Sequence, residues 1–177
     1  MAVIAKPADG EFLPYYSRYI DLIPECDLAR LLQQQIDATR AVFSTVGEDR
    51  AGYRYAPGKW SIREVLGHLA DIERVMTYRL LTAARADATP LPGMDENAWV
   101  PSSGADQRKL ADLVDEFSAI RAATIALCKG LSDEAWTRRG VANGHAITPR
   151  ALGYIVAGHE RHHLGTLRTR YAVGVRE

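Results

Sequence analysis

Apolar residues recur every three or four positions in four segments of the chain, which is the spacing of an amphipathic helix. The segments cover residues 27–45, 61–85, 106–129 and 148–171. The rest of the chain shows no convincing alternation of apolar and polar positions, so we expect no strands. The pattern predicts an all-α protein, a four-helix bundle of the up-and-down type with long connections.

Two of these helices have clear start signals. Ser61-Ile-Arg-Glu64 is a capping box, in which the serine and the glutamate each bond a free backbone amide of the first turn. Trp60, which precedes the cap, can pack against Val65 one turn later. Thr148-Pro149 pairs a capping residue with proline at the first helical position. We therefore expect the second and fourth helices to begin at these points.

The connections differ in character. Residues 1–26 form an irregular leader with a short helical turn at 15–21, residues 132–136 a single helical turn, and residues 138–147 a loop. Residues 86–105 form a long connection rich in proline, glycine and serine, and loops of that length in a compact domain are often functional. Asp95 in this connection is a candidate site residue, although a solvated loop charge is the more common role.

Composition narrows the classes of function. The chain has 177 residues, with 22 Lys and Arg against 22 Asp and Glu, so no net field attracts nucleic acid or an anionic membrane. No apolar run reaches the roughly 18 residues of a membrane span. The first residues are too short an apolar stretch for a signal peptide, and Cys26 and Cys128 lack metal or redox spacing. We expect one domain over residues 1–177, in the cytoplasm.

Three of the five histidines lie between residues 159 and 163. His159 and His163 are four residues apart, so they lie on one face of the fourth helix, whereas His162 points toward the edge of that face. His68 borders the apolar stripe of the second helix. A histidine pair one turn apart and a third histidine from a facing helix can hold a divalent ion and leave coordination positions open. The alternatives are a pair that uses His162, and three histidines that are simply core or boundary residues.

Further polar residues lie near or within the apolar stripes. Arg121 is on the inner face of the third helix, where a charge is seldom unpaired, so it is either an ion-pair partner or an anchor for an anionic substrate. Asp71 lies near His68 and is a candidate to orient an imidazole, as are Glu73 and Glu160. Glu160 falls about 100° from the histidine face, so it is not assigned as a general base.

Two motifs carry a family resemblance. Tyr53-Arg-Tyr-Ala-Pro-Gly-Lys-Trp-Ser-Ile-Arg-Glu-Val-Leu-Gly-His68 resembles the second-helix motif of the DinB-like superfamily. Ala157-Gly-His-Glu-Arg-His-His-Leu-Gly-Thr-Leu167 resembles its fourth-helix motif. The resemblance implies a four-helix bundle, often a homodimer, with a divalent metal held by His68, His159 and His163. It does not distinguish Zn, Ni, Fe and Mn.

Two classes of function are compatible with such a site. The first is a metal-dependent enzyme with a small-molecule substrate, either a hydrolase or a transferase that uses a low-molecular-weight thiol. Such a thiol has to come from outside the chain, because neither cysteine is near the histidines in sequence. The second is a non-catalytic metal-binding module of a stress response, with the same ligands but a closed pocket. We expect no nucleic acid or membrane partner in either case.

Overall fold

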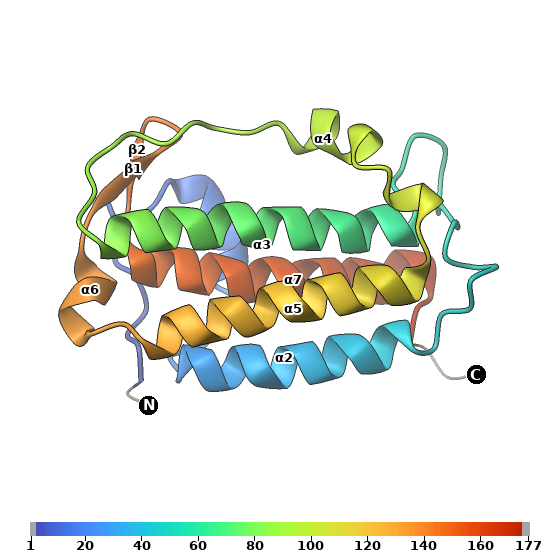
Figure 1. Ribbon diagram of the computed structural model, residues 1–177, viewed down its shortest axis with the longest axis horizontal. Coiled ribbons are helices and arrows are strands. Elements are labelled where there is room, and N and C mark those ends of the chain that lie inside the picture. Colours follow the sequence, from blue (N-terminus) through green and yellow to red (C-terminus); the bar gives the residue numbers. More distant parts are fainter. Residues whose placement is uncertain (1–2, 175–177) are drawn as a thin grey trace.

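The computed structural model describes residues 3–174 and is a bundle of four long helices (Figure 1). They are α2 (Leu28–Phe43), α3 (Ile62–Ala84), α5 (Leu110–Lys129) and α7 (Pro149–Tyr171). All four were predicted from the apolar spacing, and the four-helix bundle with long connections is confirmed. The third long helix, α5, begins later than predicted, because the residues near Asp106 form a separate short helix, η2 (Ala105–Gln107).

The direction of the helices departs from a strict up-and-down order. The connection between α3 and α5 runs back along the whole bundle, so α3 and α5 point the same way in Figure 1. The chain therefore pairs α3 with α5 in parallel, while α7 runs antiparallel to both. The length of the 85–109 connection makes this arrangement possible, since a short turn joins only antiparallel helices.

A small β-hairpin replaces the loop predicted at residues 138–147. Its strands are β1 (Gly140–Ala142) and β2 (His145–Ile147), which pair antiparallel with Val141 opposite Ala146. Asn143 and Gly144 both have positive φ, 53° and 75°, as the two central residues of a tight hairpin turn require. The Asn-Gly dipeptide is a strong hairpin signal, and it was missed because the flanking strands have only three residues each.

The long connection packs down onto the bundle. Leu91 exchanges backbone hydrogen bonds with Val141 and Asn143, both at 2.9 Å, so the connection lies alongside the hairpin. It then forms α4 (Glu96–Ser102), whose first turn is capped by the carboxylate of Asp95. Asp95 was a candidate site residue, and the structure corrects this expectation. Its side chain accepts hydrogen bonds from the backbone of its own helix instead of facing a site.

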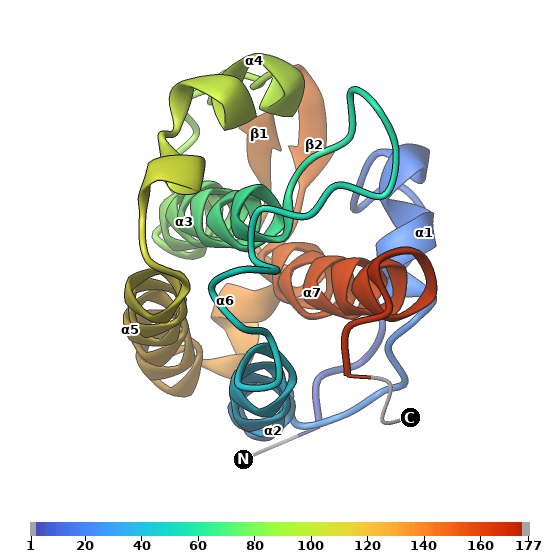
Figure 2. The ribbon, with the colours of Figure 1, turned by 90° about the vertical axis from the view of Figure 1, so that its right-hand side faces the viewer.

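The remaining short helices lie at the sides of the bundle. The predicted turn in the leader is present as η1 (Pro14–Tyr16) and α1 (Ser17–Ile20), and the turn after α5 as α6 (Asp133–Thr137). Seen end-on, α2 and α5 cover one side of the α3–α7 pair, while α1, α4 and the hairpin lie on the other (Figure 2). Within residues 3–174, no helix combines the length and apolarity needed to cross a membrane.

Apolar burial holds the bundle together along its central pair, α3 and α7. Leu66 and Leu80 of α3 and Leu152, Ile155 and Leu167 of α7 have no exposed surface. Full burial of each such side chain contributes about 1.5–3 kcal/mol relative to exposure. The central pair therefore contributes much of the buried core, and it carries the three histidines singled out above.

Candidate metal centre

His68 of α3 and the pair His159 and His163 of α7 bring their Nε2 atoms together. The Nε2 of His159 lies 3.1 Å from that of His68 and 3.1 Å from that of His163. The ligand atoms of all three side chains lie within 4.8 Å of one another. Nitrogens bound to one ion at about 2.1 Å are themselves roughly 3.0–3.4 Å apart. The spacing therefore fits a shared divalent ion.

Burial keeps these imidazoles neutral. It lowers the pKa of His68 to about 4 and that of His163 to about 3, the latter with help from the neighbouring histidines. The pKa of His159 is also far below its ordinary value, chiefly through burial. A neutral imidazole offers the lone pair that a metal needs, so near neutral pH all three are in the ligating form.

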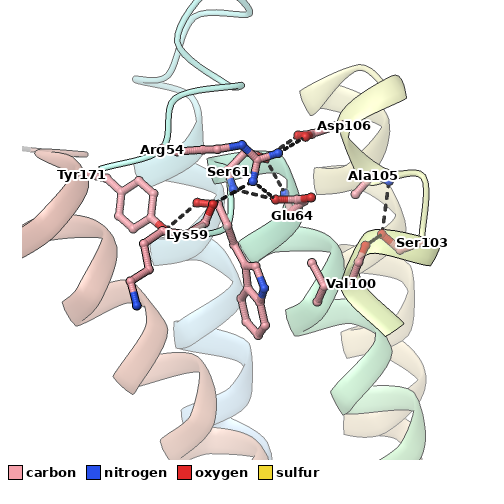
Figure 3. Close-up of polar contacts among 10 residues, drawn as sticks. Arg54, Lys59, Ser61, Glu64, Val100, Ser103, Ala105, Asp106 and Tyr171 are labelled. Atoms are coloured by element: carbon pink, nitrogen blue, oxygen red, sulfur yellow. Dashed lines mark hydrogen bonds and ion pairs between the residues drawn. The ribbon is translucent and has the colours of Figure 1, made fainter. Parts of the chain in front are cut away.

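The start of α3 is fixed by a polar network (Figure 3). Ser61 and Glu64 form the predicted capping box, with bonds of 3.0 and 2.8 Å to each other's backbone amides. Arg54 pairs with both Glu64 and Asp106, and Asp106 also accepts from the Ser61 hydroxyl. The network ties the preceding loop and η2 to the first turn of α3, two turns before His68.

The same network sets the position of Trp60. The hydroxyl of Tyr171, at the end of α7, donates to the Trp60 carbonyl at 2.7 Å. The indole ring then lies 4.6 Å from the His68 ring and stacks at 6.4 Å on that of His163. Trp60 thus limits how far either imidazole can turn, a role that the sequence did not reveal.

On the other side, α1 crosses α7 at Gly158. A Cβ at this glycine would lie 2.1 Å from the carbonyl oxygen of Tyr19, so only glycine allows the approach. The Tyr19 ring consequently packs edge-on against His159 at 5.3 Å and His162 at 5.4 Å. The glycine next to His159 therefore makes room for the neighbouring helix α1.

Arg121 lies behind the histidines in a fully buried ion cluster. Its Nε and Nη2 donate to the two oxygens of Glu73, both at 2.7 Å, and its Nη1 donates to Glu160 at 2.6 Å. Of the two predicted roles, ion-pair partner is correct and substrate anchor is wrong, because Arg121 has no exposed surface. Two carboxylates and one guanidinium carry a formal charge of −1 beside His159, which favours a cation at the histidines.

Polar residues of α2 complete this cluster. Thr39 donates to the second oxygen of Glu160, and Gln35 donates to the carbonyl of Ala157 at 2.9 Å. Gln35 and Thr39 interrupt the apolar stripe of α2, and these two bonds hold α2 against α7. They fix the helix turn that carries His159.

The other candidates lie apart from the histidine cluster or at its edge. Asp71 accepts a 3.2 Å bond from Arg74 at the half-exposed edge of α3, so no contact with His68 supports its predicted role as an orienting residue. His162 is exposed and lines the cavity described next. His145 is exposed on the hairpin.

A cavity of about 450 Å³ opens beside the three imidazoles. Its walls come from the leader, α3, α7, the 93–96 segment and the hairpin; besides the histidines they include Tyr15, Arg18, Tyr19, Trp60, Ile72, Met76, Arg79, Met94, Glu96, Asn143 and Ile155. A second cavity of about 260 Å³ lies beyond Trp60 and His163, next to Tyr55 and Tyr171. Arg79 and Arg18 were not singled out from the sequence, although Arg79 follows His68 by three helical turns on one face.

The fold is shared with several solved structures. YfiT from Bacillus subtilis, described as a probable metal-dependent hydrolase with an unusual four-helix bundle topology, is 20% identical with a TM-score of 0.69. The match covers 95% of this chain and 94% of that one. A DinB-like protein from Bacillus subtilis, YjoA, is 19% identical with a TM-score of 0.58, over 79% of this chain and 85% of its own.

A third structure, the mycothiol-dependent maleylpyruvate isomerase, is 15% identical with a TM-score of 0.64. The match covers 82% of this chain and 61% of the isomerase. At these identities the likeness shows the fold alone. No curated protein matches the chain. The family model of the DinB superfamily matches residues 31–167, which include all three clustered histidines and most of the bundle. The chain therefore belongs to the DinB superfamily.

Proposed function

We propose that this protein is a metal-dependent enzyme in which His68, His159 and His163 bind one divalent transition metal ion. The observation that carries the proposal is the convergence of three neutral imidazoles at the wall of a cavity large enough for a small molecule. Three protein ligands leave coordination positions open, which is typical of catalytic sites. Histidine ligands suit zinc, nickel and iron alike, so the metal is left open.

A divalent ion held there would supply a Lewis acid next to the bound substrate. The chain itself supplies the surroundings. Trp60 packs against His68 and His163, and Tyr19 packs against His159, so the two rings reduce the imidazole surface that water can reach. The ion pairs of Arg121 with Glu73 and Glu160 join α3 and α7 on the side of these helices that faces away from the cavity.

Two reactions suit this site. Hydrolysis is our first choice, because YfiT, described as a probable metal-dependent hydrolase, shares the fold over nearly its whole length. Transfer to a low-molecular-weight thiol is the second, because a mycothiol-dependent isomerase shares the bundle. For the second, the thiol has to be a separate molecule. Burial raises the pKa of the Cys128 thiol to about 12, and neither cysteine lines the cavity.

The non-catalytic alternative predicts an occluded site. The open cavity, with Gly93, Met94 and Glu96 of the long connection in its wall, supports the enzyme instead. A single domain over residues 1–177, a homodimer and a cytoplasmic location remain proposals that rest on the resemblance and the composition. Light scattering on the purified protein tests the dimer.

Turnover assays test the enzymatic proposal. Metal-loaded protein is incubated first with a panel of esters and amides, and then with electrophiles in the presence of mycothiol, bacillithiol or glutathione. We expect turnover in one of the two arms, and we expect it to be lost in a folded His159→Ala variant. Turnover in neither arm, or equal turnover by His159→Ala, would contradict the proposal.

A further inference from the structure

The cavity has a buried arginine at the end away from the histidines. Arg79 is only 4% exposed, yet it lines the cavity wall. It follows His68 by eleven residues, which places it about 16 Å further along α3 on almost the same face. Ile72 and Met76 occupy the two intervening positions of this face and also line the cavity. This face of α3 therefore presents the candidate metal ligand His68, then two apolar side chains, and then the cationic side chain of Arg79.

The charge of Arg79 is not neutralised by the protein. Its Nη2 donates to the carbonyl of Pro92 at 2.7 Å, and its Nη1 lies 3.8 Å from the sulfur of Met76, which is a weak acceptor. In the described part of the chain, residues 3–174, no ion pair joins it to a carboxylate. A guanidinium has five N–H donors, and these two contacts use only two of them, so others are available to a molecule in the cavity that Arg79 lines.

The lack of a carboxylate partner for Arg79 contrasts with the surroundings of Arg121. That guanidinium is equally buried, but two carboxylates surround it. A buried charge without a counter-ion is costly, and a fold that keeps one at a cavity wall is complementary to an anion. The other charged side chains of the cavity wall also favour an anionic ligand. Arg18 also lines the cavity, and its guanidinium stacks 3.8 Å from the Tyr15 ring centroid. The lining thus contains two arginines and one carboxylate, that of Glu96.

We propose that Arg79 binds a terminal oxyanion of the substrate, a carboxylate or a phosphate, while the reactive end of the substrate lies at the three histidines. The substrate is then a small elongated molecule with an apolar middle part and an anionic end. Its middle part packs on Ile72 and Met76 from α3. This inference rests on the proposed function, since the histidine end of the cavity is taken as the reactive end.

The competing explanation is purely structural, with Arg79 present only to hold Pro92 against α3. The Pro92 segment has other attachments, however. Leu91 pairs with the hairpin through two backbone bonds, and Gly93 lies so close to Asn143 that a Cβ there would come within 2.4 Å of the amide oxygen. A structural role predicts that loss of Arg79 weakens the binding of charged and neutral molecules equally.

Three matched probes separate the two explanations: hexanoate, hexyl phosphate and the neutral hexanamide. Their affinities are measured by calorimetry or NMR titration on metal-loaded protein and on protein stripped with a chelator. The variants are Arg79→Met, Arg79→Gln and Arg79→Lys. Arg74→Met is the control, because Arg74 lies on the same helix but pairs at the surface with Glu116. Thermal unfolding confirms that each variant is folded. If Arg79→Met does not fold, Arg79→Gln replaces it in the comparison.

We expect at least one of the anions to bind wild-type protein about tenfold or more tighter than hexanamide. Arg79→Met and Arg79→Gln should remove this preference and leave hexanamide unchanged, Arg79→Lys should keep part of it, and Arg74→Met should match wild type. The identity of the preferred anion distinguishes carboxylate from phosphate. Equal affinity for anion and amide in wild type, or an equal loss of both in Arg79→Met, would overturn the proposal.

The stripped protein separates this test from that of the metal site. If the histidines bind no metal, the anion preference still persists, because Arg79 is remote from them on α3. If metal binds normally but no anion is preferred, only the role of Arg79 is rejected.

Discussion

Arg121 of α5 and Glu160 of α7 form a fully buried ion pair at 2.6 Å, and Glu160 directly follows His159. The same guanidinium grips Glu73 of α3 with two further bonds. Its Nη1 also donates to the Leu32 carbonyl of α2 at 3.3 Å, so this one side chain connects all four long helices at the level of the histidine cluster. We infer that this cluster positions the backbone turn from which His159 projects.

Removal of Arg121 should be strongly destabilising. In Arg121→Met two carboxylates remain buried without a counter-ion, and we expect the free energy of unfolding to fall by about 3–5 kcal/mol. Arg74→Met breaks an ion pair of half-exposed side chains and should cost about 1 kcal/mol or less. Urea denaturation of both variants gives the comparison. A loss in Arg121→Met no larger than that in Arg74→Met would contradict the role assigned to the cluster.

Much of the fold could be predicted from periodicity and caps, because each long helix buries an apolar stripe against its neighbours. Residues 27–45 and 148–171 became α2 and α7 within two residues of the predicted ends. The hairpin could not be predicted from alternation, since three-residue strands are too short to show it. Nor could the shared direction of α3 and α5, because it depends on where a 25-residue connection packs down.

The histidines were identified because i, i+4 spacing fixes two of them on one face whatever the rest of the chain does. Trp60, Tyr19 and Arg79 were not identified as site residues, because they reach the site from a loop, the leader and a distant helical turn. Arg121 was predicted to be inward-facing, but its partners depend on helix rotation. Which of its two possible roles applies was therefore decided only by the structure.

A pair of glycines in α7 tests the contact between α1 and the histidine helix. In Gly158→Ala the new methyl group would collide with the Tyr19 carbonyl, so we expect a loss of stability of about 1–3 kcal/mol and displacement of the Tyr19 ring. In Gly165→Ala nothing lies within 4 Å, and higher helix propensity should stabilise the protein by up to about 1 kcal/mol. Thermal melts of the two variants should therefore shift in opposite directions. Shifts of the same sign would argue against the close approach.

The start of α3 provides a second stability test. Ser61→Ala removes the hydroxyl that caps the Glu64 amide and that donates to Asp106, and we expect a cost of about 1–2 kcal/mol. Ser44→Ala, which removes only an exposed bond to the Ala41 carbonyl, should change stability by less than about 0.5 kcal/mol. Chemical denaturation again provides the measurement. Indistinguishable midpoints for the two variants would show that the cap does not fix this helix.

Glu11 should make the protein sensitive to acid. Its carboxylate accepts from Arg150 at 2.6 Å and from Thr148 at 2.9 Å, and hydrogen bonds from Arg150 lower its pKa. A carboxyl with a lowered folded-state pKa stabilises the fold fully above its unfolded-state pKa of about 4.3, and this stabilisation is lost as the pH falls through the folded-state value.

Glu11→Gln should therefore cost about 1–3 kcal/mol at pH 7, and the difference from wild type should shrink below about pH 4. The exposed neighbour Asp9, changed to Asn, is the control and should show little difference at either pH. Unfolding free energies measured from pH 3 to 7 give both curves. A difference between wild type and Glu11→Gln that stays constant over this range would contradict the assignment.

The most direct test of the whole account is the metal content of the purified protein. Wild type, His159→Ala and His145→Ala are loaded with nickel or zinc, dialysed and analysed by mass spectrometry for metal per chain. His145 is the control because it lies exposed on the hairpin, outside the cluster. We predict about one ion per chain for wild type and for His145→Ala, and almost none for folded His159→Ala. Equal metal content in wild type and His159→Ala would contradict the three-histidine site.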